Sequence, residues 1–244
     1  MPEGPDYYDS MSALYANETE GINFTKEWYR HRARYKSLKG YVDANKIFII
    51  APHGGSIESG TTELALATAG FVKNFNGATD TSNTYDYFIF NGTNPSGENG
   101  KLHVTSSHYN DVDANVIVKN SVISLAFHGC TDLQPDESTG KGYKACLIGG
   151  LDEELKEILE VQLMTAGFNA YITTQDMLDG SLPNNIVNKN KRKQGIQVEL
   201  TTSLRKSFFT KNNRKGRRNS TTTDFWVFVN VIRACLEDYG IQFV

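Results

Sequence analysis

The chain has 244 residues, of which 39% are hydrophobic and 22% are charged. This composition is typical of a folded domain with an ordinary core, and it excludes a wholly disordered chain and a fibrous or coiled-coil protein. No apolar run reaches the roughly 20 residues that span a membrane, and the acidic N-terminus lacks the basic and apolar regions of a signal peptide. The three cysteines are widely spaced and form no CxxC motif, which fits synthesis in a reducing compartment.

The net charge of -3 conceals a strongly basic block in the last third of the chain. Between positions 189 and 218, Glu199 is the only acid among eleven basic residues: Lys189, Lys191, Arg192, Lys193, Arg205, Lys206, Lys211, Arg214, Lys215, Arg217 and Arg218. Such a block predicts an anionic partner or substrate. The alternative is a solvated loop that happens to be basic.

The first half of the chain predicts three strands and one helix. Residues 46–51 form an uninterrupted apolar run, typical of a buried strand, which Pro52 ends. Thr61 and Thr62 are candidate N-caps for a helix that runs to residue 72. Further strands are predicted at residues 85–90 and 101–105, on either side of a turn-rich segment. Residues 1–40 are expected to wrap the edge of the sheet, with residues 29–41 at the surface.

The second half alternates strands and helices. Strands are predicted at residues 122–127, 145–148, 169–174 and 195–200, and a closing helix at 221–239. Asp152 should cap an amphipathic helix that ends at Gly167. This order predicts a single α/β domain over residues 1–244, with one mixed, mostly parallel sheet and helices on both faces.

Polar residues at the ends of three buried strands indicate where the chemistry lies. His53, His128 and Glu199 each fall at the carboxyl end of a predicted strand, and ligands of open α/β sheets bind at those ends. Imidazole and carboxylate groups gathered there would suit a catalytic zinc ion, which takes three protein ligands and leaves one position for water.

The candidate ligands each have a structural alternative. His53 and Glu58 are five residues apart, too far for one helical face, so they would have to share a glycine-containing loop. His128 alone is equally compatible with a hydrogen-bonded structural histidine. His103 and His108 are rival histidines, in a segment rich in serine and threonine that would also suit contact with a substrate.

Glu199 is the most informative single residue. It lies in an apolar strand, where Gln197 shares its face. A carboxylate in that position requires a partner such as a lysine, an arginine or a metal-bound water. The alternative is a structural ion pair with Arg205 or Lys206.

Five segments, taken in order, resemble a known family: APHGGSIESGTTELA, KLHVTSSHYND, SLAFHG, NNIVNK and GIQVEL. The family is that of the phage and Bacillus poly-γ-glutamate hydrolases, which are similar in fold to zinc carboxypeptidases, and the resemblance covers roughly residues 46–205. It implies a catalytic domain with zinc bound by His53, Glu58 and His128, and Glu199 as general base. NNIVNK would then bring Asn188 and Lys189 to the substrate, although the family has arginine in place of Lys189, and the two are not equivalent at a carboxylate.

The expected activity is therefore zinc-dependent hydrolysis of the γ-glutamyl amide bonds of poly-γ-glutamate. Glu199 would accept a proton from the attacking water, and Arg205 or Lys189 would stabilise the oxyanion. His103 and His108 remain candidates for substrate contact. The basic block would attract the polyanion, because each residue of poly-γ-glutamate carries a free carboxylate.

Two other functions compete with this hypothesis. A nucleic-acid-binding protein would use the basic block with nearby aromatic residues for backbone contacts and stacking, but the chain has no named binding motif, so we do not expect a nucleic-acid partner. A zinc amidase acting on cell-wall peptide would share the metal chemistry. We expect a monomer with no membrane partner, made in the cytoplasm and reaching an extracellular substrate through host lysis.

Overall fold

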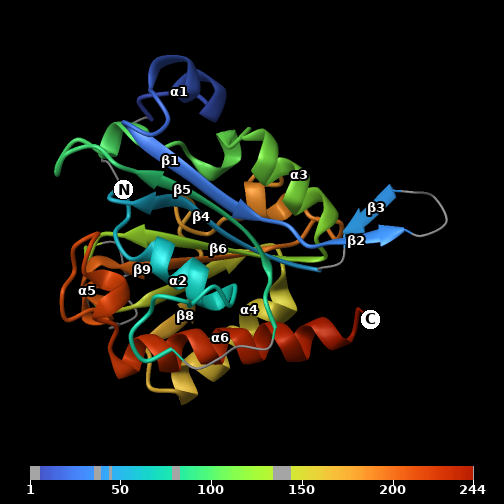
Figure 1. The fold of residues 1–244 in the computed structure, drawn as a ribbon. Coiled ribbons are helices and arrows are strands. Elements are labelled where there is room, and N and C mark those ends of the chain that lie inside the picture. The colour runs from blue at the N-terminus through green and yellow to red at the C-terminus, as the bar shows by residue number, and fades with distance from the viewer. Residues whose placement is uncertain (1–5, 36–39, 44–45, 79–82, 134–143, 244) are drawn as a thin grey trace.

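The computed structural model describes residues 6–35, 40–43, 46–78, 83–133 and 144–243 (Figure 1). Within these residues the main sheet has seven strands, in the order β1-β5-β4-β6-β9-β7-β8. In that spatial order they are β1 (Phe24–Tyr29), β5 (Asp86–Gly92), β4 (Ile47–Gly55), β6 (Ile123–Cys130), β9 (Ile196–Thr201), β7 (Cys146–Gly150) and β8 (Ala170–Ile172).

The four central strands, β5, β4, β6 and β9, run parallel to one another. The edge strand β1 is antiparallel to β5, and β7 is antiparallel to β9, while β8 is parallel to β7. A separate hairpin of β2 (Arg32–Tyr35) and β3 (Gly40–Asp43) follows β1. The predicted fold class, a mixed and mostly parallel sheet of zinc-carboxypeptidase type, is confirmed.

Helices cover both faces of the sheet, as Figure 1 shows. The described helices are α1 (Met11–Asn17), α2 (Thr61–Thr68), α3 (Val112–Asn120), α4 (Glu153–Thr165), α5 (Thr202–Ser207) and α6 (Thr223–Ile241). Side chains alternate along each strand, so Ile47 and Ile49 join the core under α2, α4 and α6, whereas Phe48 and Ile50 join the core under α1 and α3. Every residue of β4 is buried.

Side-chain caps fix the start of several helices. The Asp152 carboxylate accepts a hydrogen bond from the Leu155 backbone at the start of α4, as predicted, and Asp111 does the same for Ala114 in α3. The N-caps predicted for α2 are wrong. The N-cap residue of α2 is Gly60, with φ of 105°, and it makes no side-chain hydrogen bond to the helix. The Thr62 side chain is used elsewhere: its Oγ1 accepts the Gly55 N–H and donates to Asn91.

Other predicted elements differ from the structure. Residues 101–105 form no strand: the short 3-10 turn η1 (Gly100–Leu102) leads into an extended connection and a second 3-10 turn, η2 (Ser106–His108). The helix predicted to reach residue 72 ends at Thr68. Within residues 1–40, α1 and β1 lie along one edge of the sheet, and the described part of the chain has no helix long and apolar enough to cross a membrane.

Candidate active site

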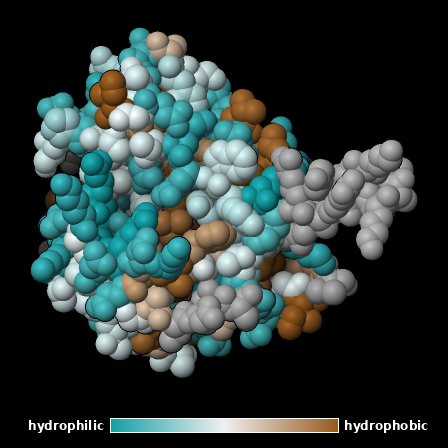
Figure 2. All heavy atoms as spheres, in the orientation of Figure 1, coloured by the Kyte–Doolittle hydropathy of each residue, from teal (hydrophilic) through white to brown (hydrophobic). Residues whose placement is uncertain are grey.

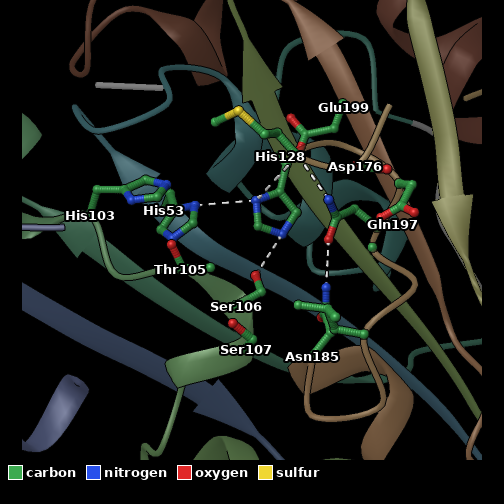
Figure 3. Close-up of a pocket in the computed structure, with 14 residues that line it drawn as sticks. His53, His103, Thr105, Ser106, Ser107, His128, Asp176, Asn185, Gln197 and Glu199 are labelled. Atoms are coloured by element: carbon green, nitrogen blue, oxygen red, sulfur yellow. Dashed lines mark hydrogen bonds and ion pairs between the residues drawn. The ribbon is translucent and has the colours of Figure 1, made fainter. Parts of the chain in front are cut away.

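The candidate site lies where the carboxyl ends of β4, β6 and β9 meet. These strands are parallel neighbours, and His128 and Glu199 are directly paired across β6 and β9. The register of β4 against β5 shifts between Ala51 and Gly54, where Pro52 lacks the N–H that a regular ladder requires. The irregularity places His53 beside His128, and both line a cavity of about 190 Å³ with Glu199 (Figure 3).

Three buried donor atoms converge at the floor of this cavity. His53 Nδ1 lies 3.0 Å from Glu58 Oε1 and 3.2 Å from His128 Nδ1. His128 Nδ1 is 3.7 Å from Glu58 Oε2. The loop after β4 curls back so that Glu58 reaches this point, and its Oε2 also accepts the Gly129 N–H at 2.8 Å.

Hydrogen bonds behind the two histidines orient their rings. His53 Nε2 donates to the Val104 carbonyl at 2.8 Å, so the Nδ1 of a neutral His53 ring presents a lone pair to the cavity. His128 Nε2 lies 3.1 Å from Ser106 Oγ, an arrangement that also turns the His128 Nδ1 inward. Such outer hydrogen bonds are the usual support of metal-binding histidines.

These donors fit a zinc ion. Ligands about 2.0–2.1 Å from a tetrahedral zinc lie about 3.3 Å from each other, close to the separations of the three groups. Two inward nitrogen lone pairs and a carboxylate repel one another unless a cation or a proton lies between them. Burial alone would lower the pKa of His53, but the Glu58 charge and its hydrogen bond outweigh burial and raise that pKa. Burial lowers the pKa of His128 to about 3 and keeps it neutral. Burial alone would raise the pKa of Glu58, but His53 and the other histidines outweigh it and lower that pKa to about 2.

His103 is a third histidine at the site, in a different arrangement. Its Nδ1 lies 2.8 Å from the Asp6 carboxylate, whose other oxygen accepts the Thr105 N–H at 2.6 Å. The His103 ring stacks on His53 with centroids 3.9 Å apart and planes 29° apart. Its buried Nε2 lies 3.8 Å from Glu58 Oε1 and has no hydrogen-bond partner within the described part of the chain. Among the described residues, His53, Glu58 and His103 also lie close enough together to hold an ion.

Glu199 is buried beside the histidines and held by an amide chain. Gln197 Nε2 donates to Glu199 Oε1 at 3.0 Å, and Asn185 Nδ2 donates to Gln197 Oε1 at 3.0 Å (Figure 3). The second carboxylate oxygen, Oε2, is buried and has no hydrogen-bond partner among the residues that the structure describes. Burial, and then the nearby Glu58 charge, raise the pKa of Glu199 well above its ordinary value. A carboxyl group with a raised pKa and one free oxygen is suited to accept and return a proton.

A sequence model described as poly-γ-glutamate hydrolase matches residues 8–231. The chain belongs to this family. The resemblance predicted from the five sequence segments is thus confirmed.

Relatives of this poly-γ-glutamate hydrolase family member occur in Bacillus subtilis strain 168. The UPF0714 protein YmaC is 29% identical over 96% of this chain and 85% of its own length. The SPbeta prophage-derived YoqZ is 29% identical, and YndL is 30% identical, over 81% and 76% of this chain. The chain spans 64% and 65% of the lengths of these last two proteins.

Two solved structures are similar over nearly the whole chain. A bacteriophage poly-γ-glutamate hydrolase has a TM-score of 0.77 and 27% identity, covering 97% of this chain and 99% of the other. The zinc-free apo form of YndL has a TM-score of 0.78 and 26% identity, with coverage of 96% and 98%.

The expected substrate-binding residues of this family member do not all reach the cavity. The Arg205 guanidinium is buried behind Gly129 and donates to the carbonyls of Leu200, Ser59 and Cys130. Lys189 Nζ contacts the Tyr109 carbonyl at 3.5 Å. Neither residue lines the cavity, and neither do Asn188, which is buried, or His108, which is exposed, whereas His103 does line it.

Three residues at the site were not predicted as site residues: Asp6, Ser106 and Asn185. Asp6 meets His103 across 97 positions of sequence, and Ser106 meets His128 across 22. No local pattern links such pairs. Only the position of Gln197, on the same strand face as Glu199, was visible in the sequence.

Proposed function

We propose that this chain is a zinc-dependent hydrolase that cleaves the γ-glutamyl amide bonds of poly-γ-glutamate. The observation that carries the proposal is the convergence of His53 Nδ1, Glu58 Oε1 and His128 Nδ1 beside Glu199, whose Oε1 lies 4.0 Å from His128 Nδ1. Membership of the family, and the likeness to a bacteriophage poly-γ-glutamate hydrolase, support the choice of substrate. A similar solved structure, that of YndL, is described as an apo, zinc-free form, which supports zinc as the metal.

His53, Glu58 and His128 are the proposed zinc ligands. A ligating imidazole holds its ion close to its own ring plane, because the nitrogen lone pair lies in that plane. The planes of His53 and His128 cross at 64°, so both lone pairs can point to one ion. His103 stacks nearly parallel to His53 at 3.9 Å, so the two rings do not share an ion in this way.

Glu199 is the proposed general base. When bound, zinc would supply Lewis-acid activation of a water and of the scissile carbonyl. Glu199 takes a proton from the attacking water and later delivers it to the leaving amine. The hydrogen bond from Gln197 to Oε1 holds the carboxylate beside His128.

The test uses purified chain, poly-γ-glutamate and a metal assay. The unmodified chain should shorten the polymer on a gel, lose this activity with a chelator and regain it with zinc. Glu199→Gln should keep its zinc while turnover falls about 10²–10⁴-fold. A zinc-loaded unmodified chain that leaves the polymer intact would refute the substrate assignment. Peptidoglycan in a parallel reaction tests the cell-wall amidase alternative.

A further inference from the structure

Strand β9 divides the basic block into two groups at opposite ends of the sheet. Residues 189–193 precede β9, and the Lys191 N–H donates to the Ser121 carbonyl, just before β6 begins. Arg192 pairs there with Asp152 at 2.6 Å. Residues 205–218 follow β9 and therefore lie at the edge that carries Glu199. Figure 2 shows hydrophilic side chains along this side of the molecule, where α5 lies in Figure 1.

Two of the cations at the site edge serve the fold. Arg205 is buried among backbone carbonyls. Arg217 is 2% exposed, and its Nε lies 2.7 Å from Glu63 while its guanidinium donates to the Gly55 carbonyl. The cations left accessible at this edge are exposed or half-exposed: Lys206, Lys211, Arg214, Lys215 and Arg218.

The cavity beside Glu199 contains no lysine or arginine among the described residues that line it. It carries instead two further acids, Asp176 and Asp179. A substrate with one carboxylate per residue gains no charge pairing from these groups. Cations that recognise its carboxylates therefore have to lie outside the cavity.

A second hollow at the same edge offers such cations. It measures about 500 Å³ and is lined by Arg214 and Arg218 together with Thr25, Thr62, Asn91 and Thr93; we call it the arginine hollow. Its wall includes Gly55, two residues after His53, and two residues of extended chain span at most about 7 Å. The hollow thus adjoins the loop that carries the candidate zinc ligands.

The ion pairs among the residues that line the arginine hollow leave Arg214 and Arg218 available for a ligand. The lining also includes Lys26, Glu27, Glu63 and Arg217, but Glu63 is paired with Arg217, and Lys26 Nζ pairs with Asp111 and Asp113. Arg218 makes a long, half-exposed contact of 3.7 Å with Glu27, and its guanidinium lies 5.8 Å from the centre of the Phe75 ring. No ion pair joins Arg214 to another of the residues that the structure describes.

We propose that the arginine hollow binds carboxylates of poly-γ-glutamate at residues beyond the bond being cleaved. This inference rests on the proposed function. The planar guanidinium group matches a carboxylate in a two-pronged hydrogen bond. A volume near 500 Å³ is within the range of ligand sites. Short oligomers confined to the cavity would not reach this hollow.

The test measures binding of labelled poly-γ-glutamate to zinc-loaded chain in the Glu199→Gln background, where the polymer is not consumed. The variant R214A/R218A removes two charges from the hollow. The matched control K119A/K191A removes two exposed charges from the opposite edge, since Lys119 lies in the last turn of α3, shortly before Ser121. Melting temperatures verify that each variant is folded, and R214E provides a second variant whose side chain is exposed.

R214A/R218A should weaken binding of the long polymer about fivefold, as expected for two exposed ion pairs. The control should change it less than twofold, and the difference should shrink above about 0.5 M salt. Binding of a γ-glutamyl dimer should be equal in both variants. Equal polymer binding by the hollow and control variants would overturn the inference. Failure of the unmodified chain to cleave the polymer would instead count against the proposed function.

Discussion

The amide of Gln197 provides a sharp test of how Glu199 is positioned. Gln197 is buried, donates to Glu199 Oε1 at 3.0 Å and accepts from Asn185 at 3.0 Å. Gln197→Met keeps the length of the side chain but removes these two hydrogen bonds, together with a longer one of 3.4 Å from Gln197 Nε2 to the Leu178 carbonyl. Glu199 would then be free to rotate, and its carboxylate would no longer be held beside His128.

The expected loss follows from the strength of this hydrogen bond. A hydrogen bond to a charged group contributes about 1.5–3 kcal/mol, so kcat should fall about 10- to 150-fold. KM and zinc content should change little, because Gln197 touches none of the proposed ligands. The hydrogen bond from Gln197 also lowers the pKa of Glu199 against the larger effect of burial. Removing it raises that pKa further, so the acid limb of the kcat profile should move to higher pH.

The assay is steady-state hydrolysis of poly-γ-glutamate across pH, together with zinc analysis. Gln162→Met is the matched control, because it makes the same substitution at an exposed position of α4. If Gln197→Met retains kcat within twofold of this control, the amide chain does not position Glu199. Loss of zinc from Gln197→Met would show that the defect lies in the metal site instead.

The remaining predictions concern stability and metal binding. Arg217→Met leaves the buried Glu63 without its partner, which should lower the free energy of unfolding by about 3–5 kcal/mol and the melting temperature by about 10 °C. A melting temperature within 2 °C of that of the unmodified chain would contradict this. The double variant R217M/E63L should recover part of the lost stability. His128→Ala should lower the zinc content well below one ion per chain, whereas His103→Ala should keep most of it. The reverse pattern in a metal assay would make His103 the third ligand.

Sequence patterns predicted the central strands because these strands are buried on both faces. β4 begins with a continuous apolar run and β6 is apolar up to Phe127 apart from Ser124, whereas polar and apolar residues alternate in β9. The polar residues of these strands that meet at the site are His53, His128, Gln197 and Glu199. The helix α3 escaped prediction because its apolar residues do not form one stripe: Val112 and Val116 are 74% and 40% exposed, while Ile117 is buried. A strand was wrongly predicted at residues 101–105, because Leu102 and Val104 are buried in the core without joining a strand.

Contacts between segments far apart in the chain could not be predicted from the sequence. The basic block looked continuous because its members are close in sequence, yet β9 carries the two halves to opposite ends of the sheet. The sequence suggested that Arg205 and Arg217 face the substrate. In the structure Arg205 donates to buried backbone carbonyls, and Arg217 pairs with the buried carboxylate of Glu63. Charge alone does not distinguish an arginine that supports the backbone from one that faces solvent.

The bond between Asp6 and His103 has a practical consequence for anyone who produces the protein. Asp6 lies upstream of the first helix and of the segment that the family shares, yet its carboxylate holds both the His103 ring and the Thr105 amide. Trimming the chain back to α1 would strip that support from a ring stacked on His53. An affinity tag therefore belongs after α6 rather than before Asp6.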